Sequence, residues 1–290
     1  MSAERERRLA SGLWQRALAS DTLPPFDATW SGLITFGGRG LLIDPGFRDP
    51  SDADVLLAWA AARGATDVDR VALTHTHPDH VAGLPALLER LGAVPVHVHP
   101  AEIDRLPSGV RGVATGDDRV LPLAGRRVRA LHTPGHAPGH LTFAVETDAP
   151  EEADANDALF VGDLLTGRGG AWVGLPYGDV DAYLASLARI RARAPARLGP
   201  AHGDAIDDPA AALDAAAAHR RDRLEEIVAA LATPRTLDAL QRELYGEVPP
   251  DAERFVRGAL LASLASLLRA RRIAHVGTDE AGPYQAMPGA

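Results

Sequence analysis

The stretch Thr74–His80 constrains this chain more than any other, because it places three imidazoles and a carboxylate within seven consecutive residues. The apolar run Val71–Leu73 directly before it predicts the end of a buried strand. In an extended segment alternate side chains point the same way, so His75 and His77 can face one point in space. Two neutral imidazoles there suit zinc or a similar divalent ion, and the stretch therefore predicts a metal site.

Pro78 predicts that a helix follows at once, because its fixed φ suits the first helical position. Asp79 and His80 then lie on the exposed first turn. Four potential ligands thus emerge at the carboxyl end of one strand, where open α/β folds place their chemistry. Clustered histidines can also lie on a surface loop or satisfy hydrogen bonds in a core. Imidazoles at positions i and i+2, then a carboxylate and an imidazole at i+4 and i+5, favour the metal site.

Composition restricts the chemistry further. The 290 residues include no cysteine, which excludes disulfides, thiolate ligands and a cysteine nucleophile. All 30 basic residues are arginine, which excludes a Schiff-base lysine and the lysine of a phosphate-binding loop. The formal charge of −9 gives no overall attraction to nucleic acid. The metal ligands must therefore be nitrogen and oxygen atoms.

The charged start of the chain and the lack of a long apolar run predict a cytoplasmic protein without a membrane partner. No apolar run approaches the roughly 20 residues that span a bilayer. Residues 1–8 mix charges and lack the apolar core of a secretory signal. At 290 residues, we expect one large domain or a domain with an appendage.

The sequence before the histidines predicts a helix over 8–19, a β-hairpin over 30–46 and a helix over 51–63. The first helix rests on composition. The hairpin ends in Asp44, which can cap the following turn. The helix over 51–63 opens with Ser51, a good N-cap residue, and has apolar residues at helical spacing.

Later segments place more polar residues at strand ends. A helix is predicted over 81–91 and a strand over 94–99, whose two histidines lack a nearby carboxylate and are interpreted as structural, with His99 a lesser candidate for lining a cleft. In the loop over 133–143, prolines and glycines make a rigid platform for one outward ligand. Strands over 158–163 and 197–203 follow.

Five motifs in order over residues 44–203 closely resemble the metallo-β-lactamase superfamily, whose signature is His-x-His-x-Asp-His. This resemblance implies an α/β fold with four αββα layers, in which helices cover two packed sheets and the metals lie at one edge. It also implies a dinuclear site. One ion would be held by His75, His77 and His136, the other by Asp79, His80 and His202, with Asp163 between them.

Every ligand position of the resembled family is filled, which disfavours a degenerate binding module. His77 is not replaced by the Glu expected of oxygen-reducing di-iron relatives, which favours hydrolysis over redox chemistry. We expect two divalent ions, zinc before iron or manganese, since imidazole and carboxylate accept each.

Other residues would support the ligands or line the pocket. In the resembled family an Asp at the position of Asp44 supports a metal-binding histidine, a role compatible with capping a turn. His132 and His140 flank His136, and we interpret them as supporting or packing residues. The candidates for the substrate pocket are Phe47, Trp172 and Tyr177. The last two could equally pack in the core.

The sequence predicts a catalytic domain over 1–212 and a small, mainly helical domain over 213–290. Helices over 213–231, 236–244 and 251–272 and a strand over 273–277 resemble a winged-helix module, found in a subgroup that includes the β-lactamase-like protein 2 hydrolases. Between His219 and His275 the chain has 10 arginines and 8 acidic residues, which scarcely makes a nucleic-acid-binding face. A cap or a homodimer contact is at least as well supported. The tail from Thr278 is expected to be loose.

We expect a dinuclear hydrolase in which a metal-bound hydroxide, oriented by Asp79, attacks a thioester, ester or lactone, as in glyoxalase II-like chemistry. Without lysine, the chain lacks the basic residue that typical glyoxalase II enzymes use for glutathione. The alternative is a phosphodiesterase that cleaves single-stranded RNA, and a lesser one is a mononuclear iron persulfide dioxygenase. We expect a small-molecule substrate rather than RNA. An exported antibiotic-hydrolysing β-lactamase is disfavoured because no export signal is visible.

Overall fold

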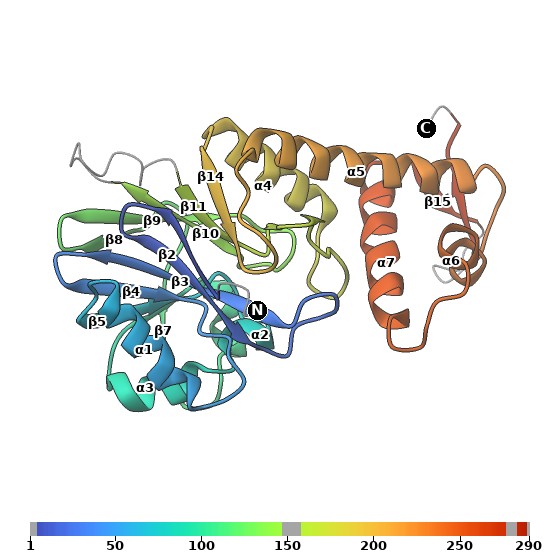
Figure 1. Cartoon of the computed structure of the whole chain (residues 1–290). Coiled ribbons are helices and arrows are strands. Elements are labelled where there is room, and N and C mark those ends of the chain that lie inside the picture. The colour runs from blue at the N-terminus through green and yellow to red at the C-terminus, as the bar shows by residue number, and fades with distance from the viewer. Residues whose placement is uncertain (1–4, 147–157, 277–282, 289–290) are drawn as a thin grey trace.

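Two β-sheets packed face to face form the centre of the protein, and helices cover their outer faces (Figure 1). The computed structural model describes residues 5–146, 158–276 and 283–288. One sheet has seven strands in the order β1 to β7, and the other has the order β14-β11-β10-β9-β8. The predicted four-layer αββα sandwich is confirmed.

The seven-stranded sheet changes from antiparallel to parallel pairing at its fourth strand. Its strands are β1 (Glu6–Ala10), β2 (Leu13–Ala19), β3 (Ala28–Phe36), β4 (Arg39–Ile43), β5 (Asp67–Ala72), β6 (Val96–Val98) and β7 (Gly112–Ala114). Because β4 and β5 are parallel, their carboxyl ends meet at one edge of the sheet. Asp44 and the histidines after β5 are therefore neighbours.

The second sheet brings three further chain segments to that edge. Its strands are β8 (Val120–Leu123), β9 (Arg126–His132), β10 (Leu141–Glu146), β11 (Ala158–Gly162) and β14 (Arg197–Pro200). The loop between β9 and β10 carries His136, while Asp163 and His202 follow the parallel strands β11 and β14. A small hairpin, β12 (Leu165–Thr166) and β13 (Gly169–Gly170), lies beyond Asp163.

Apolar side chains fill three layers. Leu13, Ile34, Phe143 and Phe160 are among those packed between the sheets. The first sheet is covered by α1 (Asp52–Ala62), α2 (Pro78–Val81), α3 (Leu84–Leu91) and the short 3₁₀ helix η1 (Pro100–Arg105). The second is covered by α4 (Val180–Ala192) and the start of α5 (Pro209–Ala230).

The helix predicted over 8–19 is wrong, because this segment forms β1 and β2. Leu13, Gln15 and Ala17 are buried, while Trp14 and Arg16 between them are partly exposed, which is the two-residue period of a strand. Pairing of β2 with β1 and β3 outweighs the helical preference of its alanines and arginines.

The helix predicted over 81–91 is interrupted at Gly83, which separates α2 from α3. The Gly83 N–H donates to the Pro45 carbonyl, and the Phe47 ring occupies the space that a side chain at Gly83 would need. Phe47 is 1% exposed and belongs to the core, so its prediction as a pocket wall is wrong. The helix over 51–63 is confirmed as α1, although the Ser51 hydroxyl donates to Asp49 and does not cap the helix.

The C-terminal unit, residues 209–276 and 283–288, is mainly helical. It contains α5, α6 (Leu237–Tyr245), α7 (Glu253–Arg269) and a hairpin of β15 (Ile273–His275) and β16 (Tyr284–Ala286). Helix α5 begins above α4 and extends over α7 (Figure 1), and the domain boundary predicted at 212/213 falls inside α5. The tail predicted to be loose begins outside the described residues, but β16 is ordered by pairing with β15. The winged-helix likeness and the homodimer contact stay predictions.

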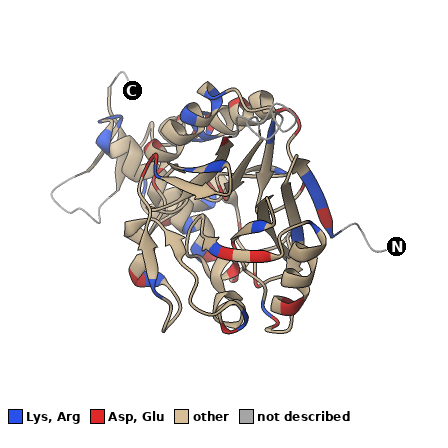
Figure 2. Ribbon diagram, turned by 90° about the vertical axis from the view of Figure 1, so that its left-hand side faces the viewer, with Lys and Arg blue, Asp and Glu red and all other residues tan. Residues whose placement is uncertain are grey.

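None of the helices within the described ranges is both long and apolar enough to cross a bilayer. Figure 2 shows arginines and acidic residues interspersed along the ribbon.

Candidate metal centre

Three imidazoles converge at the edge of the sandwich. His75 Nε2, His77 Nδ1 and His136 Nε2 lie 2.8–3.2 Å from one another. Ligand atoms around a tetrahedral zinc ion, at bonds of about 2.0–2.1 Å, are separated by about 3.3 Å. The three nitrogens therefore already form one face of a metal site.

A second group, Asp79, His80 and His202, lies beside the first. His202 Nε2 is 3.2 Å from Asp79 Oδ2, and His80 Nε2 is 3.9 Å from that oxygen. Asp163 faces both groups. Its Oδ1 lies 3.4 Å from both His80 Nε2 and His202 Nε2, and its Oδ2 lies 3.5 Å from His136 Nε2. The structure thus brings together all seven predicted ligands, with one carboxylate between the two groups.

The buried atoms of the second group fit a cation. Among the described residues, His80 Nε2, His202 Nε2 and Asp163 Oδ1 are buried without a hydrogen-bond partner. Leaving such atoms unpaired is costly, and a divalent ion between them would satisfy all three. Two nitrogens and a carboxylate oxygen are also a donor set that zinc accepts.

The pKa values of His75 and His77 are shifted in the opposite direction from that of His80. Burial lowers the pKa of His75 well below its ordinary value and that of His77 to about 3, so both imidazoles are held neutral, the form that binds metals. Burial alone would also lower the pKa of His80, but the carboxylates of Asp163, Asp44 and Asp79 outweigh it and raise that pKa well above its ordinary value. Positive charge is therefore favoured where the second ion would lie.

Oxygen acceptors fix the orientation of the ligand imidazoles. His136 Nδ1 donates to the Trp172 carbonyl at 2.7 Å, His202 Nδ1 to the Ala28 carbonyl at 3.1 Å, and His80 Nδ1 to Asp44 Oδ2 at 2.9 Å. Each bond engages Nδ1, so Nε2 is the ring nitrogen that faces the centre and can bind an ion once it carries no proton. The support of a ligand histidine that was predicted for Asp44 is thus seen in the geometry.

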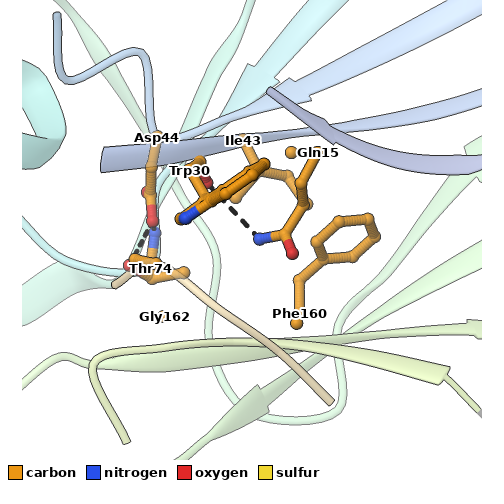
Figure 3. A pocket seen from close by; sticks show the side chains of 10 residues that line it. Gln15, Trp30, Ile43, Asp44, Thr74, Phe160 and Gly162 are labelled. Carbon is orange, nitrogen blue, oxygen red and sulfur yellow. Dashed lines mark hydrogen bonds between the residues drawn. The ribbon is translucent and has the colours of Figure 1, made fainter. Parts of the chain in front are cut away.

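Asp44 also accepts hydrogen bonds from the backbone N–H and the hydroxyl of Thr74, at 2.7 and 2.6 Å (Figure 3). Asp44 and Thr74 line a cavity of about 10 Å³ between the sheets, together with Gln15 and Phe160. Such a volume suits about one water molecule. The ligands are therefore backed by buried polar groups.

Aromatic side chains border the centre. Tyr177 is 39% exposed, and its ring centre lies 6.3 Å from that of His77. Trp172 is half-buried behind His136, and its Nε1 donates to the Phe255 carbonyl of α7 at 3.0 Å. Tyr177 thus presents a partly exposed ring beside a ligand, whereas Trp172 connects a ligand to the C-terminal unit.

The remaining predicted histidines lie behind the ligands. His140 is buried and accepts from the Asp163 backbone N–H at 3.1 Å, so it supports that residue. His132 stacks on His99, with ring centres 4.1 Å apart, and its Nε2 donates to the Pro138 carbonyl. His99 therefore packs against a histidine.

Sequence reasoning missed two residues of the site. The Phe26 ring stacks on the His202 ring with their centres 5.4 Å apart, and the two residues are too distant in sequence for a local pattern to predict this contact. Glu102 is buried and accepts hydrogen bonds from Thr76 and Gly139, which lie in two ligand-bearing loops. A single acidic residue in a short helix carries no signal of such a role.

Comparison with known proteins agrees with this geometry. A family model described as metallo-beta-lactamase superfamily matches residues 24–202. The lactamase-like protein vrtG of Penicillium aethiopicum is 30% identical over 245 residues, covering 81% of this chain and 73% of that protein. An atrochrysone carboxyl ACP thioesterase of Passalora fulva is 29% identical, covering 77% of this chain and 64% of that protein. A hydroxyacylglutathione hydrolase of Xylella fastidiosa is 36% identical, covering 59% and 57%.

A solved structure extends the likeness to nearly the whole chain. A metallo-beta-lactamase family protein of Thermus thermophilus has a TM-score of 0.76 at 24% identity, and the match covers 95% of this chain and 99% of that one. At this identity the match shows a shared fold. Its coverage includes most of the C-terminal unit.

Proposed function

This chain belongs to the metallo-β-lactamase superfamily and is a metal-dependent hydrolase, and we propose that it hydrolyses thioesters at a dinuclear site. In this proposal the two ions are zinc. The ligands are, for the first ion, His75, His77 and His136 and, for the second, Asp79, His80 and His202, with Asp163 shared. The observation that carries the proposal is the position of Asp163, whose two oxygens face the two groups separately.

When bound, the two ions would supply hydroxide at neutral pH and a Lewis acid for the substrate carbonyl. The Asp79 carboxylate can accept the proton of the attacking water and orient its oxygen toward the carbonyl carbon. The thiol product of a thioester has a pKa near 8.5, so it leaves as a thiolate with little help from an acid. Tyr177 forms one wall for the substrate.

The names of two relatives support a thioester as substrate. One is a thioesterase and the other hydrolyses hydroxyacylglutathione, which is itself a thioester. Both act on acyl groups carried by a thiol. The interspersed charges in Figure 2 favour a small molecule over a polyanion such as RNA.

The proposal is tested by incubating the zinc-loaded protein with an acyl thioester, a lactone and a labelled single-stranded RNA in parallel. We expect thioester hydrolysis that Asp79→Ala abolishes while circular dichroism shows an unchanged fold. Arg242→Gln, an exposed substitution on α6, is the control and should keep full turnover. RNA cleavage by the parent protein without thioester turnover would refute the proposal. Wild-type turnover by Asp79→Ala, with both ions bound, would refute the role of Asp79.

A further inference from the structure

An arginine lies beside the metal centre without a role in holding it. The Arg105 guanidinium carbon, at the end of η1, is 4.1 Å from the centre of the Tyr177 ring. That ring is in turn a neighbour of the His77 ring. Arg105 is therefore one aromatic ring away from a ligand of the first ion. Its side chain is 36% exposed, so it can reach a molecule in solution.

Glu102 fixes Arg105 relative to the ligands. Its carboxylate is 1% exposed and accepts from Arg105 Nη1 at 3.2 Å. The same carboxylate accepts from the Thr76 hydroxyl, between His75 and His77, and from the Gly139 N–H at 2.9 Å. One buried acid thus ties the arginine to both loops that supply the first ligand group. Glu102 holds the charge of Arg105 and Tyr177 holds its planar face, so Arg105 loses little conformational freedom on binding a ligand.

The remaining donors of Arg105 are suited to an anion. A guanidinium carries five N–H donors in a planar fork that matches carboxylate and phosphate oxygens. Among the described residues, its one hydrogen-bonded partner is Glu102, through Nη1, so Nε and Nη2 are left for a ligand. We propose that Arg105, held by Glu102 and Tyr177, binds a carboxylate or phosphate group of the substrate while the thioester lies at the metal centre. The part that concerns the substrate rests on the proposed function.

Three thioesters with one acyl chain length test this site and locate the anion. They are pentanoyl-N-acetylcysteamine, which is neutral, glutaryl-N-acetylcysteamine, which has an acyl carboxylate, and pentanoyl coenzyme A, which has phosphates on the thiol side. We expect kcat/KM for one anionic substrate to exceed that for the neutral one. In Arg105→Gln that ratio should fall by about tenfold to a hundredfold, mainly through KM, as expected for a lost charge-assisted hydrogen bond.

Further variants separate recognition from folding. Arg105→Lys keeps the charge and should retain more of the preference than Arg105→Gln. Tyr177→Ala removes the ring that holds the planar face of Arg105 but leaves the pair with Glu102. It should lower the preference for the anionic thioester, and it tests the site independently if Arg105→Gln folds poorly. Arg242→Gln should leave the ratio unchanged. The anionic substrate whose preference Arg105→Gln loses identifies the acyl or the thiol side as the source of the anion.

If Arg105→Gln leaves the ratio of kcat/KM for the anionic and neutral thioesters unchanged, whether or not all three values fall, the anion site is overturned. If the parent protein hydrolyses none of them, the thioester proposal fails, but the site is still tested by calorimetry with glutarate and with inorganic phosphate. Binding of either anion that is lost in Arg105→Gln supports it. Equal binding by the parent and the variant overturns it.

Discussion

The metal centre and the C-terminal unit are held together by different interactions. At the centre, short loops after strand ends present buried polar atoms, and hydrogen bonds to carbonyl and carboxylate oxygens fix them. In the C-terminal unit, helices present apolar faces, and residues such as Leu240 and Leu260 are fully buried. A single substitution should therefore affect chemistry in the first region and stability in the second.

The two regions meet at Trp172. Its carbonyl accepts from the ligand His136, and its indole donates to Phe255 of α7. The loop that carries Trp172 contacts α7 again at Leu175, whose N–H donates to the Gly258 carbonyl at 3.0 Å. A substitution at this junction should therefore affect both turnover and stability.

The largest effect is expected from Asp163→Asn. The amide cannot place a negative oxygen before both ligand groups, so kcat/KM should fall on the order of 10⁴-fold, about 5.5 kcal/mol of transition-state stabilisation. Metal analysis should find fewer than two ions per chain, while circular dichroism stays unchanged. Asp118→Asn, an exposed control, should keep both ions. Two bound ions and parent-like turnover in Asp163→Asn would contradict the shared-ligand assignment.

Leu260→Ala should show the opposite behaviour. Removing a fully buried leucine in α7 should lower the free energy of unfolding by about 2–4 kcal/mol, through lost burial and a cavity. The kcat of the folded fraction should stay within about twofold of the parent, since α7 supplies no ligand. Urea unfolding and active-site titration measure the two quantities. A tenfold loss of kcat in the fully folded variant would contradict the expectation that the C-terminal unit affects stability and not chemistry.

The same contrast explains how much could be predicted from sequence. The ligands in Thr74–His80 were found because metal chemistry needs particular residue types at close spacing. His136, Asp163 and His202 were assigned only through the resemblance to the family, since each stands alone in its segment. The strands β1 and β2 were missed because alanine and arginine favour helices, and only pairing with β3 decides otherwise. Phe47 was misplaced because Gly83, distant in sequence, provides the space for its ring. Contacts between distant segments leave no local pattern.

Trp172→Phe should give an intermediate effect at the junction. Phenylalanine keeps an aromatic ring beside Phe255 but loses the donor to its carbonyl, which should lower the free energy of unfolding by about 1 kcal/mol. The carbonyl that orients His136 remains, so kcat should fall no more than about threefold. Chemical unfolding and steady-state kinetics test this. Parent-like stability would mean that the indole bond does not join the two regions.

The smallest effect is expected from Arg269→Met. This arginine of α7 pairs with Asp179 and Asp181 at the start of α4. Because its side chain is 49% exposed, solvent screens these pairs, and their loss should lower the free energy of unfolding by less than about 1 kcal/mol. The difference from the parent should vanish in about 1 M salt, where charges are screened within about 3 Å. The matched control is Arg272→Met, which breaks a pair with Glu225 inside the C-terminal unit. A loss above about 2 kcal/mol in Arg269→Met alone would show that charge, rather than apolar packing, attaches this unit to the sandwich.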